Sequence, residues 1–287
     1  MRAVAVTKRS LILEEKKASD TALGVAVLRA VHQLTGAEPK ILEDPVIVRM
    51  LDETTRHRIE AHPEAYLTPE RRVLLSNVLV RSRYAEDQLA EAVAHGIRQF
   101  VILGAGMDTF AYRQPAWADK LQIFELDHPA SQKAKRHRLG AARIPTPANL
   151  RYVEIDFEKD TLPTILARGD FDFREPAFFS CLGVLMYLTG GAVDAILQFV
   201  ASMPRSSEIV FSFANAGLDS TIEKSAEAAG EPWLTKFQPD ELDQKLRGLG
   251  FSEIRFLTPE MIAERYFHDR RDGLSAPRRA SIVNARV

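Results

Sequence analysis

Cysteine and long apolar runs are both scarce in this sequence. Cys181 is the only cysteine among 287 residues, so no disulfide can form within the chain, and a CxxC metal or redox site is excluded. No apolar segment approaches the roughly 18 residues that a membrane helix needs. The apolar stretches after Met1 are too short for the core of a signal peptide. We therefore expect a cytoplasmic protein that does not bind membranes.

An excess of charge of either sign is also missing. The chain has 38 Lys and Arg against 39 Asp and Glu, which gives a formal net charge of -1. A chain with this balance has no overall electrostatic footprint for nucleic acid. The arginines between Arg270 and Arg286 are the best candidates for a local basic patch, but we expect them to form a solvated tail. The expected partner is a small molecule, and we expect a monomer.

The sequence from residue 98 onward alternates between strand and helix patterns. Its apolar content of 46% suits a buried core. Strands are predicted at residues 100–103, 121–126, 152–155, 177–182, 209–213, 252–257 and 280–287. Helices are predicted at residues 130–139, 161–168, 191–203 and 239–249. Repeated strand–helix units predict an α/β fold with an open, mostly parallel sheet that helices cover on both faces, and we expect the C-terminal strand to be antiparallel.

Residues 1–97 have helical patterns throughout. Ser19-Asp20-Thr21 offers a helix start, and Asp44 before Pro45 offers another. A long helix is predicted from Pro69 to near Gly96. Its candidate buried residues are Val73, Leu74, Val78, Leu89 and Val93. We therefore predict an N-terminal helical cap over residues 1–97 and an α/β domain over residues 98–287, with a lid insertion at about 214–236.

A glycine turn, Gly104-Ala105-Gly106, ends the first predicted strand. Ligands of open α/β sheets bind beyond the carboxyl ends of the strands, and glycines there let the backbone turn tightly and approach a ligand. Asp127 ends the second strand, where it is placed to accept hydrogen bonds from ribose hydroxyls. Thr109 stands where a dinucleotide-binding turn has its third glycine, which disfavours NAD. The alternative is that the glycines only make a turn and that Asp127 caps the next helix.

Several motifs in order resemble the leucine carboxyl methyltransferase family and its bacterial polyketide O-methyltransferase relatives. The first is FVILGAGMDTFAYR, at residues 100–113. Further matches lie at residues 21–30, 44–45, 81–87, 124–129, 155–157, 183–189, 231–233 and 250–251. The resemblance implies a class I methyltransferase (Rossmann-like) sheet and S-adenosyl-L-methionine as the cofactor.

The resemblance also implies a set of cofactor-binding residues. Arg81 is implied to hold the methionine carboxylate, because a guanidinium offers a charge-assisted fork to a carboxylate, with Arg83 as the second candidate. Solvation on a helix face is the alternative for both. The remaining implied contacts are Gly104, Ala105 and Gly106 under the methionine, Asp127 on the ribose, Asp156 on the adenine amino group and Phe157 near the adenine ring. For Asp156, the alternative is a cap or turn aspartate.

Leu182 is the last implied cofactor-binding residue, and it marks a departure from the eukaryotic members, which have a glutamate near the cofactor at this position. A bacterial type of role therefore fits better: O-methylation of a carboxylate or phenolic oxygen on a small molecule. Tyr187 and Trp233 are the predicted substrate-binding residues, with burial in the core as the alternative. We assign no catalytic base and no metal. Two other functions stay open, namely an NAD-type oxidoreductase and a non-catalytic module that binds S-adenosyl-L-methionine or a partner.

Overall fold

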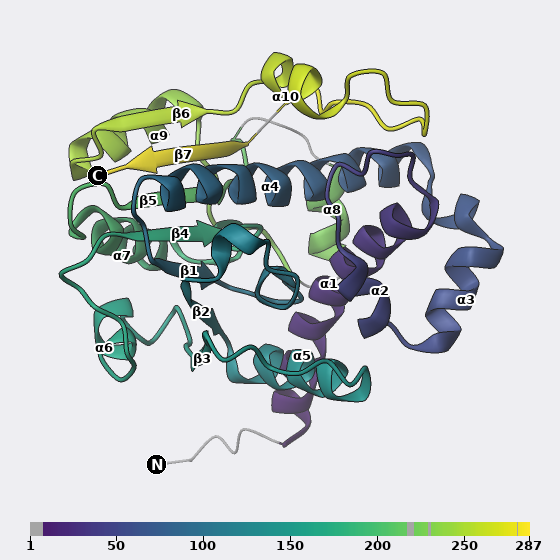
Figure 1. Cartoon of the computed structure of the whole chain (residues 1–287), viewed down its shortest axis with the longest axis horizontal. Helices are drawn as coiled ribbons and strands as arrows, with labels where there is room; N and C mark the ends of the chain where they lie inside the picture. Colours follow the sequence, from purple (N-terminus) through teal and green to yellow (C-terminus); the bar gives the residue numbers. More distant parts are fainter. Residues whose placement is uncertain (1–7, 217–220, 229–230, 280) are drawn as a thin grey trace, which may run out of the picture.

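A single twisted sheet organises the molecule. The computed structural model describes residues 8–216, 221–228, 231–279 and 281–287. Within these residues, seven strands pair in the order β3-β2-β1-β4-β5-β7-β6. The strands are β1 (Gln99–Leu103), β2 (Gln122–Asp127), β3 (Leu150–Glu154), β4 (Ala177–Cys181), β5 (Glu208–Ser212), β6 (Glu253–Phe256) and β7 (Ile282–Arg286). Only β7 runs antiparallel to its neighbours, so the predicted mostly parallel sheet with an antiparallel C-terminal strand is confirmed (Figure 1).

The predicted strands agree with the observed ones to within two residues at either end. The central strands β1 and β4 are buried along their whole length, as expected for parallel strands covered on both faces. The last predicted strand began at residue 280, which lies outside the described residues, and β7 begins at Ile282.

Helices cover both faces of the sheet. Val101 and Leu103 of β1 pack in one core cluster with residues of α6 (Leu162–Leu166), α7 (Gly190–Ala201) and α9 (Pro239–Leu249). The alternate residues Phe100 and Ile102 pack in a second cluster, with residues of α4 (Pro69–Ala94) and α10 (Pro259–Tyr266). The helix predicted at residues 161–168 is present as α6, but it is shorter than predicted.

The N-terminal helices meet the sheet at the carboxyl ends of its parallel strands. They are α1 (Lys8–Thr35), α2 (Pro45–Met50) and α3 (Glu53–Ala61), and α1 contacts both α4 and α5 (Pro129–Ala141). In Figure 1 these helices gather at the right, towards which β4 points. Asp44 caps α2 as predicted, because its carboxylate accepts from the Ile47 N–H at 3.2 Å. The helix start predicted at residues 19–21 is wrong: α1 already begins at Lys8, since the residues before Ser19 include many good helix formers.

The long helix α4 lies across one face of the sheet (Figure 1). Val78 and Leu89 are buried as predicted, but Val73 is 53% exposed, so its predicted burial is wrong. The buried face begins at Leu75 and continues at helical spacing. α4 contacts β4 and β5 of the sheet. The predicted boundary between the cap and the α/β domain, after residue 97, therefore separates α4 from the sheet against which it packs. The division into two domains stays a prediction.

The segment after β5 contains α8 (Thr221–Ala228). The predicted lid insertion at about 214–236 lies partly outside the described residues, which omit 217–220 and 229–230. Phe237 closes the segment, because its N–H donates to the Ala214 carbonyl at 2.9 Å. In the part of the chain that is described, no helix combines the length and the apolar character needed to cross a membrane.

Candidate cofactor and acceptor site

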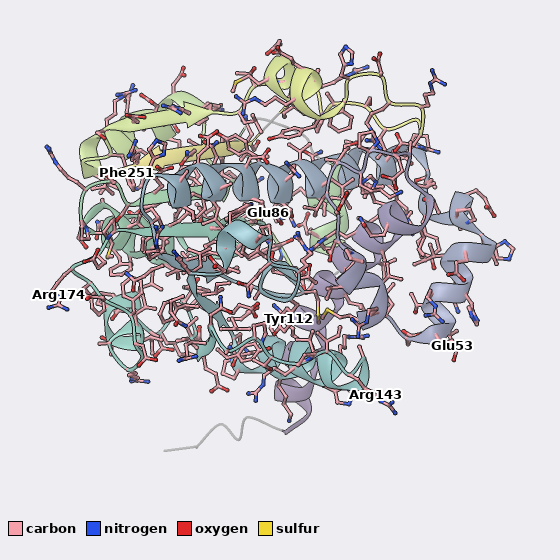
Figure 2. All side chains as sticks on the ribbon, viewed as in Figure 1. Glu53, Glu86, Tyr112, Arg143, Arg174 and Phe251 are labelled. Carbon is pink, nitrogen blue, oxygen red and sulfur yellow. The ribbon has the colours of Figure 1, made fainter. Side chains whose placement is uncertain are left out.

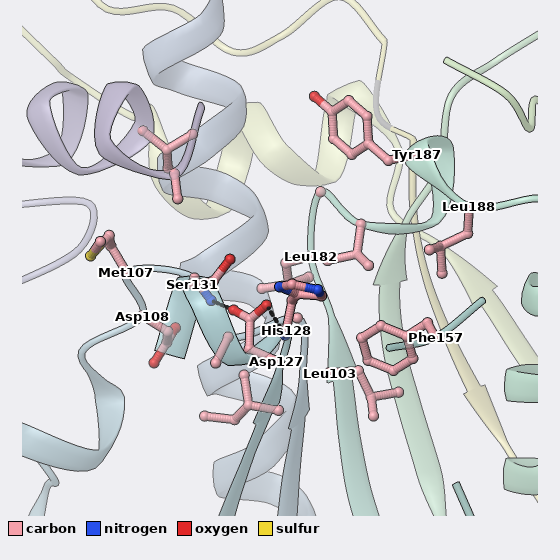
Figure 3. A pocket seen from close by; sticks show the side chains of 18 of the residues that line it. Leu103, Met107, Asp108, Asp127, His128, Ser131, Phe157, Leu182, Tyr187 and Leu188 are labelled. Carbon is pink, nitrogen blue, oxygen red and sulfur yellow. Dashed lines mark hydrogen bonds between the residues drawn. The ribbon is translucent and has the colours of Figure 1, made fainter. Parts of the chain in front are cut away.

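A cavity of about 570 Å³ opens at the carboxyl ends of β1, β2 and β4. Most residues that the sequence proposed for the site line it. They are Arg81, Gly104, Ala105, Gly106, Asp127, Asp156, Phe157, Leu182 and Tyr187. Figure 3 shows Met107, Asp108, Asp127 and Ser131 on one side, opposite Leu103, Phe157 and Leu188. One end of the cavity is therefore polar on one wall and apolar on the other.

The glycine turn forms the floor next to β1. Gly104 and Gly106 both have positive φ, at 68° and 49°, which explains why the sequence has glycine there. A Cβ on Gly104 would also collide with the Val184 side chain. The N–H groups of Gly104 and Ala105 donate to the Leu126 carbonyl at 2.8 and 3.1 Å, so the turn is fixed to the end of β2.

Asp127 connects β2 to the same turn. One carboxylate oxygen accepts from the Gly106 N–H at 2.5 Å, and the other accepts from the His128 N–H at 2.7 Å (Figure 3). Burial raises the pKa of Asp127, although these two N–H groups oppose the effect. Asp127 does not cap the next helix: His128 caps α5, with its Nδ1 accepting from the Ala130 N–H at 3.3 Å. The capping alternative for Asp127 is therefore wrong.

Arg81 projects from α4 towards the cavity and lies directly over Gly183. A Cβ at Gly183, where φ is 74°, would lie 2.6 Å from a guanidinium nitrogen of Arg81. No hydrogen bond or ion pair joins the Arg81 side chain to any described residue. Burial lowers its pKa to about 10, so the guanidinium stays protonated at neutral pH. Within the described part of the chain, the cavity thus presents a cation without an anionic partner.

Arg83 does not line the cavity. Its side chain is 45% exposed and pairs with Asp87 at 2.8 Å, one turn further along α4. Residues two apart on an α-helix point in directions about 200° apart. Of the two candidate arginines, only Arg81 can therefore reach a ligand in the cavity.

Asp156 and Phe157 follow β3 at the opposite end. Asp156 accepts from the Glu158 N–H at 3.1 Å and from Lys159 at 2.6 Å, and the Lys159 ammonium lowers its pKa. It is thus a turn aspartate that also lines the cavity. Phe157 packs against the core and, with Leu182, provides apolar surface at this end (Figure 3).

Tyr187 and Trp233 are neighbours, but only Tyr187 lines the cavity. Burial raises the pKa of the Tyr187 phenol, while the Trp233 indole and the Arg81 cation act in the opposite direction. Tyr187 therefore stays protonated at neutral pH and can donate a hydrogen bond. Glu231, Pro232 and Leu234, next to Trp233 in the sequence, line the cavity, whereas Trp233 does not, so its contact with a substrate stays a prediction.

The sequence interpretation missed several lining residues, above all Ala22, Val25 and Arg29 of α1. Arg29 gave a usable signal, since it is a charged residue within the predominantly apolar stretch from Leu23 to Val31. A buried charge in such a stretch needs a partner or a function. Among the described residues, no group of His, Cys, Asp and Glu side chains is arranged to hold a metal ion.

The strand order, the glycine turn and the cavity at the carboxyl ends together define a class I S-adenosyl-L-methionine-dependent methyltransferase fold. A structure of a putative methyltransferase from Thermobifida fusca has the same fold, with a TM-score of 0.53 and 19% identity over 90% of this chain and 93% of that one. This likeness concerns the fold alone.

The family follows from the sequence comparisons. The model of the leucine carboxyl methyltransferase family matches residues 22–201. A Bacillus subtilis protein described as "Putative S-adenosyl-L-methionine-dependent methyltransferase YktD" is 35% identical over 76% of this chain and 75% of its own length. A Mycobacterium marinum protein described in the same terms is 27% identical over 88% and 83% of the two chains. The chain belongs to the leucine carboxyl methyltransferase family, and it is an S-adenosyl-L-methionine-dependent methyltransferase.

Proposed function

We propose that this enzyme methylates a carboxylate or phenolic oxygen of a small molecule, with the methyl donor in the cavity at the glycine turn. The observation that carries the proposal is the Arg81 guanidinium over Gly183, which lines the same cavity as the glycine turn and has no partner among the described residues. The methionine carboxylate of the donor supplies an anion for this cation. Asp127 accepts from the ribose hydroxyls, and Asp156 accepts from the adenine amino group. Phe157 and Leu182 pack on the adenine ring.

The polar end of the cavity suits the charges of the donor. Asp127 keeps unused acceptor sites, because each carboxylate oxygen can accept more than the one hydrogen bond that it now has. Gly104, Ala105 and Gly106 line the cavity, so the methionine moiety can lie against the backbone of the turn. The bound donor supplies a methyl group that its sulfonium already activates.

The cavity is also lined by Tyr187, Pro232 and Leu234. We place the acceptor there. Its oxygen forms a bond to the methyl carbon while the carbon–sulfur bond breaks, and the electron pair stays on sulfur. Aligning the reactants can supply about 7–11 kcal/mol of the barrier reduction, and the Tyr187 hydroxyl can orient the acceptor oxygen. A carboxylate, with a reference pKa near 4, is already ionised at neutral pH, whereas a phenol, with a pKa of about 10, must lose a proton.

The first experiment is calorimetric titration with S-adenosyl-L-methionine, S-adenosyl-L-homocysteine and NAD. We expect the two sulfur compounds to bind and NAD not to bind. Incubating the enzyme and donor with a panel of small phenols and carboxylic acids, followed by mass spectrometry, then tests transfer. Mild alkali hydrolyses a methyl ester and leaves a methyl ether intact, so the same samples identify the oxygen. Methylation of nitrogen or carbon alone would contradict the proposal. The predicted monomer is measured by light scattering of the purified protein.

A further inference from the structure

One buried hydroxyl holds the outer end of the glycine turn. Thr109 is fully buried. Its Oγ1 donates to Asp44 at 2.7 Å and accepts from Arg29 at 2.8 Å and from Arg113 at 3.0 Å. A hydroxyl has one donor and two acceptor sites, so every hydrogen-bonding position of Thr109 is occupied.

Two of the three partners of Thr109, Arg29 and Asp44, come from the N-terminal segment, whereas Arg113 follows Thr109 four residues later. Arg29 lies on α1 and also donates to the Met107 carbonyl at 3.3 Å. Asp44 is the residue that caps α2, and it pairs with Arg29. Arg113 follows the turn and donates to Glu86 of α4 at 3.0 Å. Figure 2 shows Glu86 in the interior of the view, on α4. Thr109 thus joins the turn to α1, α2 and α4.

The charges around Thr109 compensate one another. Arg29 and Arg113 face Asp44 and Glu86, and the four side chains are from 0 to 18% exposed. Breaking a buried set of this kind leaves a charge without a partner, which is strongly unfavourable. The geometry of the set is therefore well determined, and with it the position of the residues that it contacts.

The turn is consequently held from two directions. Asp127 binds the Gly106 N–H from the side of β2, and Arg29 binds the Met107 carbonyl from the side of α1. Both Met107 and Arg29 line the cavity. A Cβ on Gly106 would lie only 3.6 Å from the Ala22 Cβ of α1, so the spacing between α1 and the turn sets the width of the cavity at this point.

We propose that Thr109 is a positioning residue for the methyl donor: through Arg29 and Arg113, its hydroxyl sets the turn at residues 104–108 against α1 and so determines donor affinity. The inference rests on the proposed function in one respect, namely that the donor binds at this turn. Thr109 itself does not line the cavity and acts only through the turn.

Thr109→Val and Thr109→Ser form a matched pair for the test. Valine keeps the shape and loses the hydroxyl, whereas serine keeps the hydroxyl. Calorimetric titration with S-adenosyl-L-homocysteine is run on both and on the unmodified enzyme, together with thermal unfolding. We expect valine to raise the dissociation constant about tenfold, which corresponds to roughly 1.4 kcal/mol, and serine to stay within about twofold.

The outcomes separate the inference from the proposed function. If the unmodified enzyme does not bind S-adenosyl-L-homocysteine, the proposed function fails. If the unmodified enzyme binds and Thr109→Val binds equally well with a lower melting temperature, Thr109 is only structural and the inference is overturned. Equal weakening by valine and serine overturns it too. Should the valine variant not fold, Arg113→Lys replaces it. Lysine keeps the positive charge beside Glu86 but lacks the Nε–H that Arg113 donates to Thr109. An unchanged dissociation constant for Arg113→Lys overturns the inference.

Discussion

The cavity and the interior behind β2 each contain a cationic side chain, but the electrostatic environments of the two differ. Lys135 on α5 pairs with Glu125 on β2 at 2.6 Å, and both side chains are 1% exposed. Arg81 is half-buried in the cavity wall and has no hydrogen-bond or ion-pair partner among the described residues. The charge of Lys135 is therefore balanced within the protein, whereas the charge of Arg81 is available to an anion in the cavity. We expect the first charge to matter for stability and the second for ligand binding.

Two tyrosines lie close to the Lys135–Glu125 pair behind β2. Tyr112 and Tyr152 hydrogen-bond to each other, and the Lys135 ammonium lies 5.6 Å from the Tyr112 ring centre. Figure 2 places Tyr112 in the interior of the view, in contrast to Arg174 at its edge. Burial raises the pKa of Glu125 to about 7, despite the opposing effect of Lys135. Lys135 pairs with Glu125 Oε2, whereas Glu125 Oε1 has no hydrogen-bond partner among the described residues. The neighbouring Asp127 lines the cavity instead.

Lys135→Met should cause the largest effect, a loss of about 3–5 kcal/mol in the free energy of unfolding, because Glu125 stays buried without its partner. Thermal or urea unfolding measures it. The control is the exposed Lys133→Met, which should stay within about 0.5 kcal/mol. An equal loss in both variants would remove the distinction between the two regions.

The same variant should show a defined pH dependence. Without Lys135, the folded-state pKa of Glu125 rises further above its unfolded value of about 4.3. The folded state then binds more protons than the unfolded state between those two values, so stability falls as pH rises through this window. We expect the defect of Lys135→Met to be smaller at about pH 5 than at about pH 8. Unfolding curves at the two pH values measure it, and an equal defect at both would contradict a buried ionised Glu125.

Arg81→Met makes the same chemical change in the cavity, with the opposite consequence. Stability should not fall, since the variant removes a cation that has no partner among the described residues. Affinity for S-adenosyl-L-homocysteine should fall by about 1.5–3 kcal/mol, the range for hydrogen bonds to charged groups. Arg83→Met is the matched control and should bind normally. A wild-type dissociation constant for Arg81→Met would exclude Arg81 from the donor site.

Asp127→Asn should have a smaller effect on donor affinity, about 1–2 kcal/mol, because the amide oxygen can still accept from Gly106 while one ribose acceptor is lost. Calorimetric titration with S-adenosyl-L-homocysteine measures it, with thermal unfolding of the same samples. Loss of stability without loss of affinity would assign Asp127 to the structural group, together with Glu125.

The smallest effect is expected for His128→Ala. Loss of the cap on α5 should cost about 0.5–1 kcal/mol in the free energy of unfolding, and His128→Asn should restore it. Donor affinity should stay unchanged in both variants. A large loss of affinity in His128→Ala would instead place this histidine among the donor-binding residues.

Residues close together in the sequence carried most of the successful predictions. The first strand was found from a short apolar run, and Gly104, Gly106 and Asp127 were found from a turn and a strand end. These features are local, since a buried strand needs apolar residues and a tight turn needs glycine. The N-terminal helices were less well predicted: the start of α1 was placed too late although the residues before Ser19 include good helix formers, and the exposure of Val73 depends on what packs against α4.

The sequence by itself determined the order of strands and helices, the glycine turn at the end of β1 and the acidic residue at the end of β2. Only the tertiary structure decided that Arg81 rather than Arg83 faces the cavity. It also decided that Glu125 forms an ion pair with Lys135 and that Arg29 donates a hydrogen bond to Thr109, 80 positions away in the sequence. The physical reason is that hydrogen-bonding periodicity and backbone turns are encoded over a few residues, whereas the pairing of buried charges depends on the rotation of whole helices against the sheet.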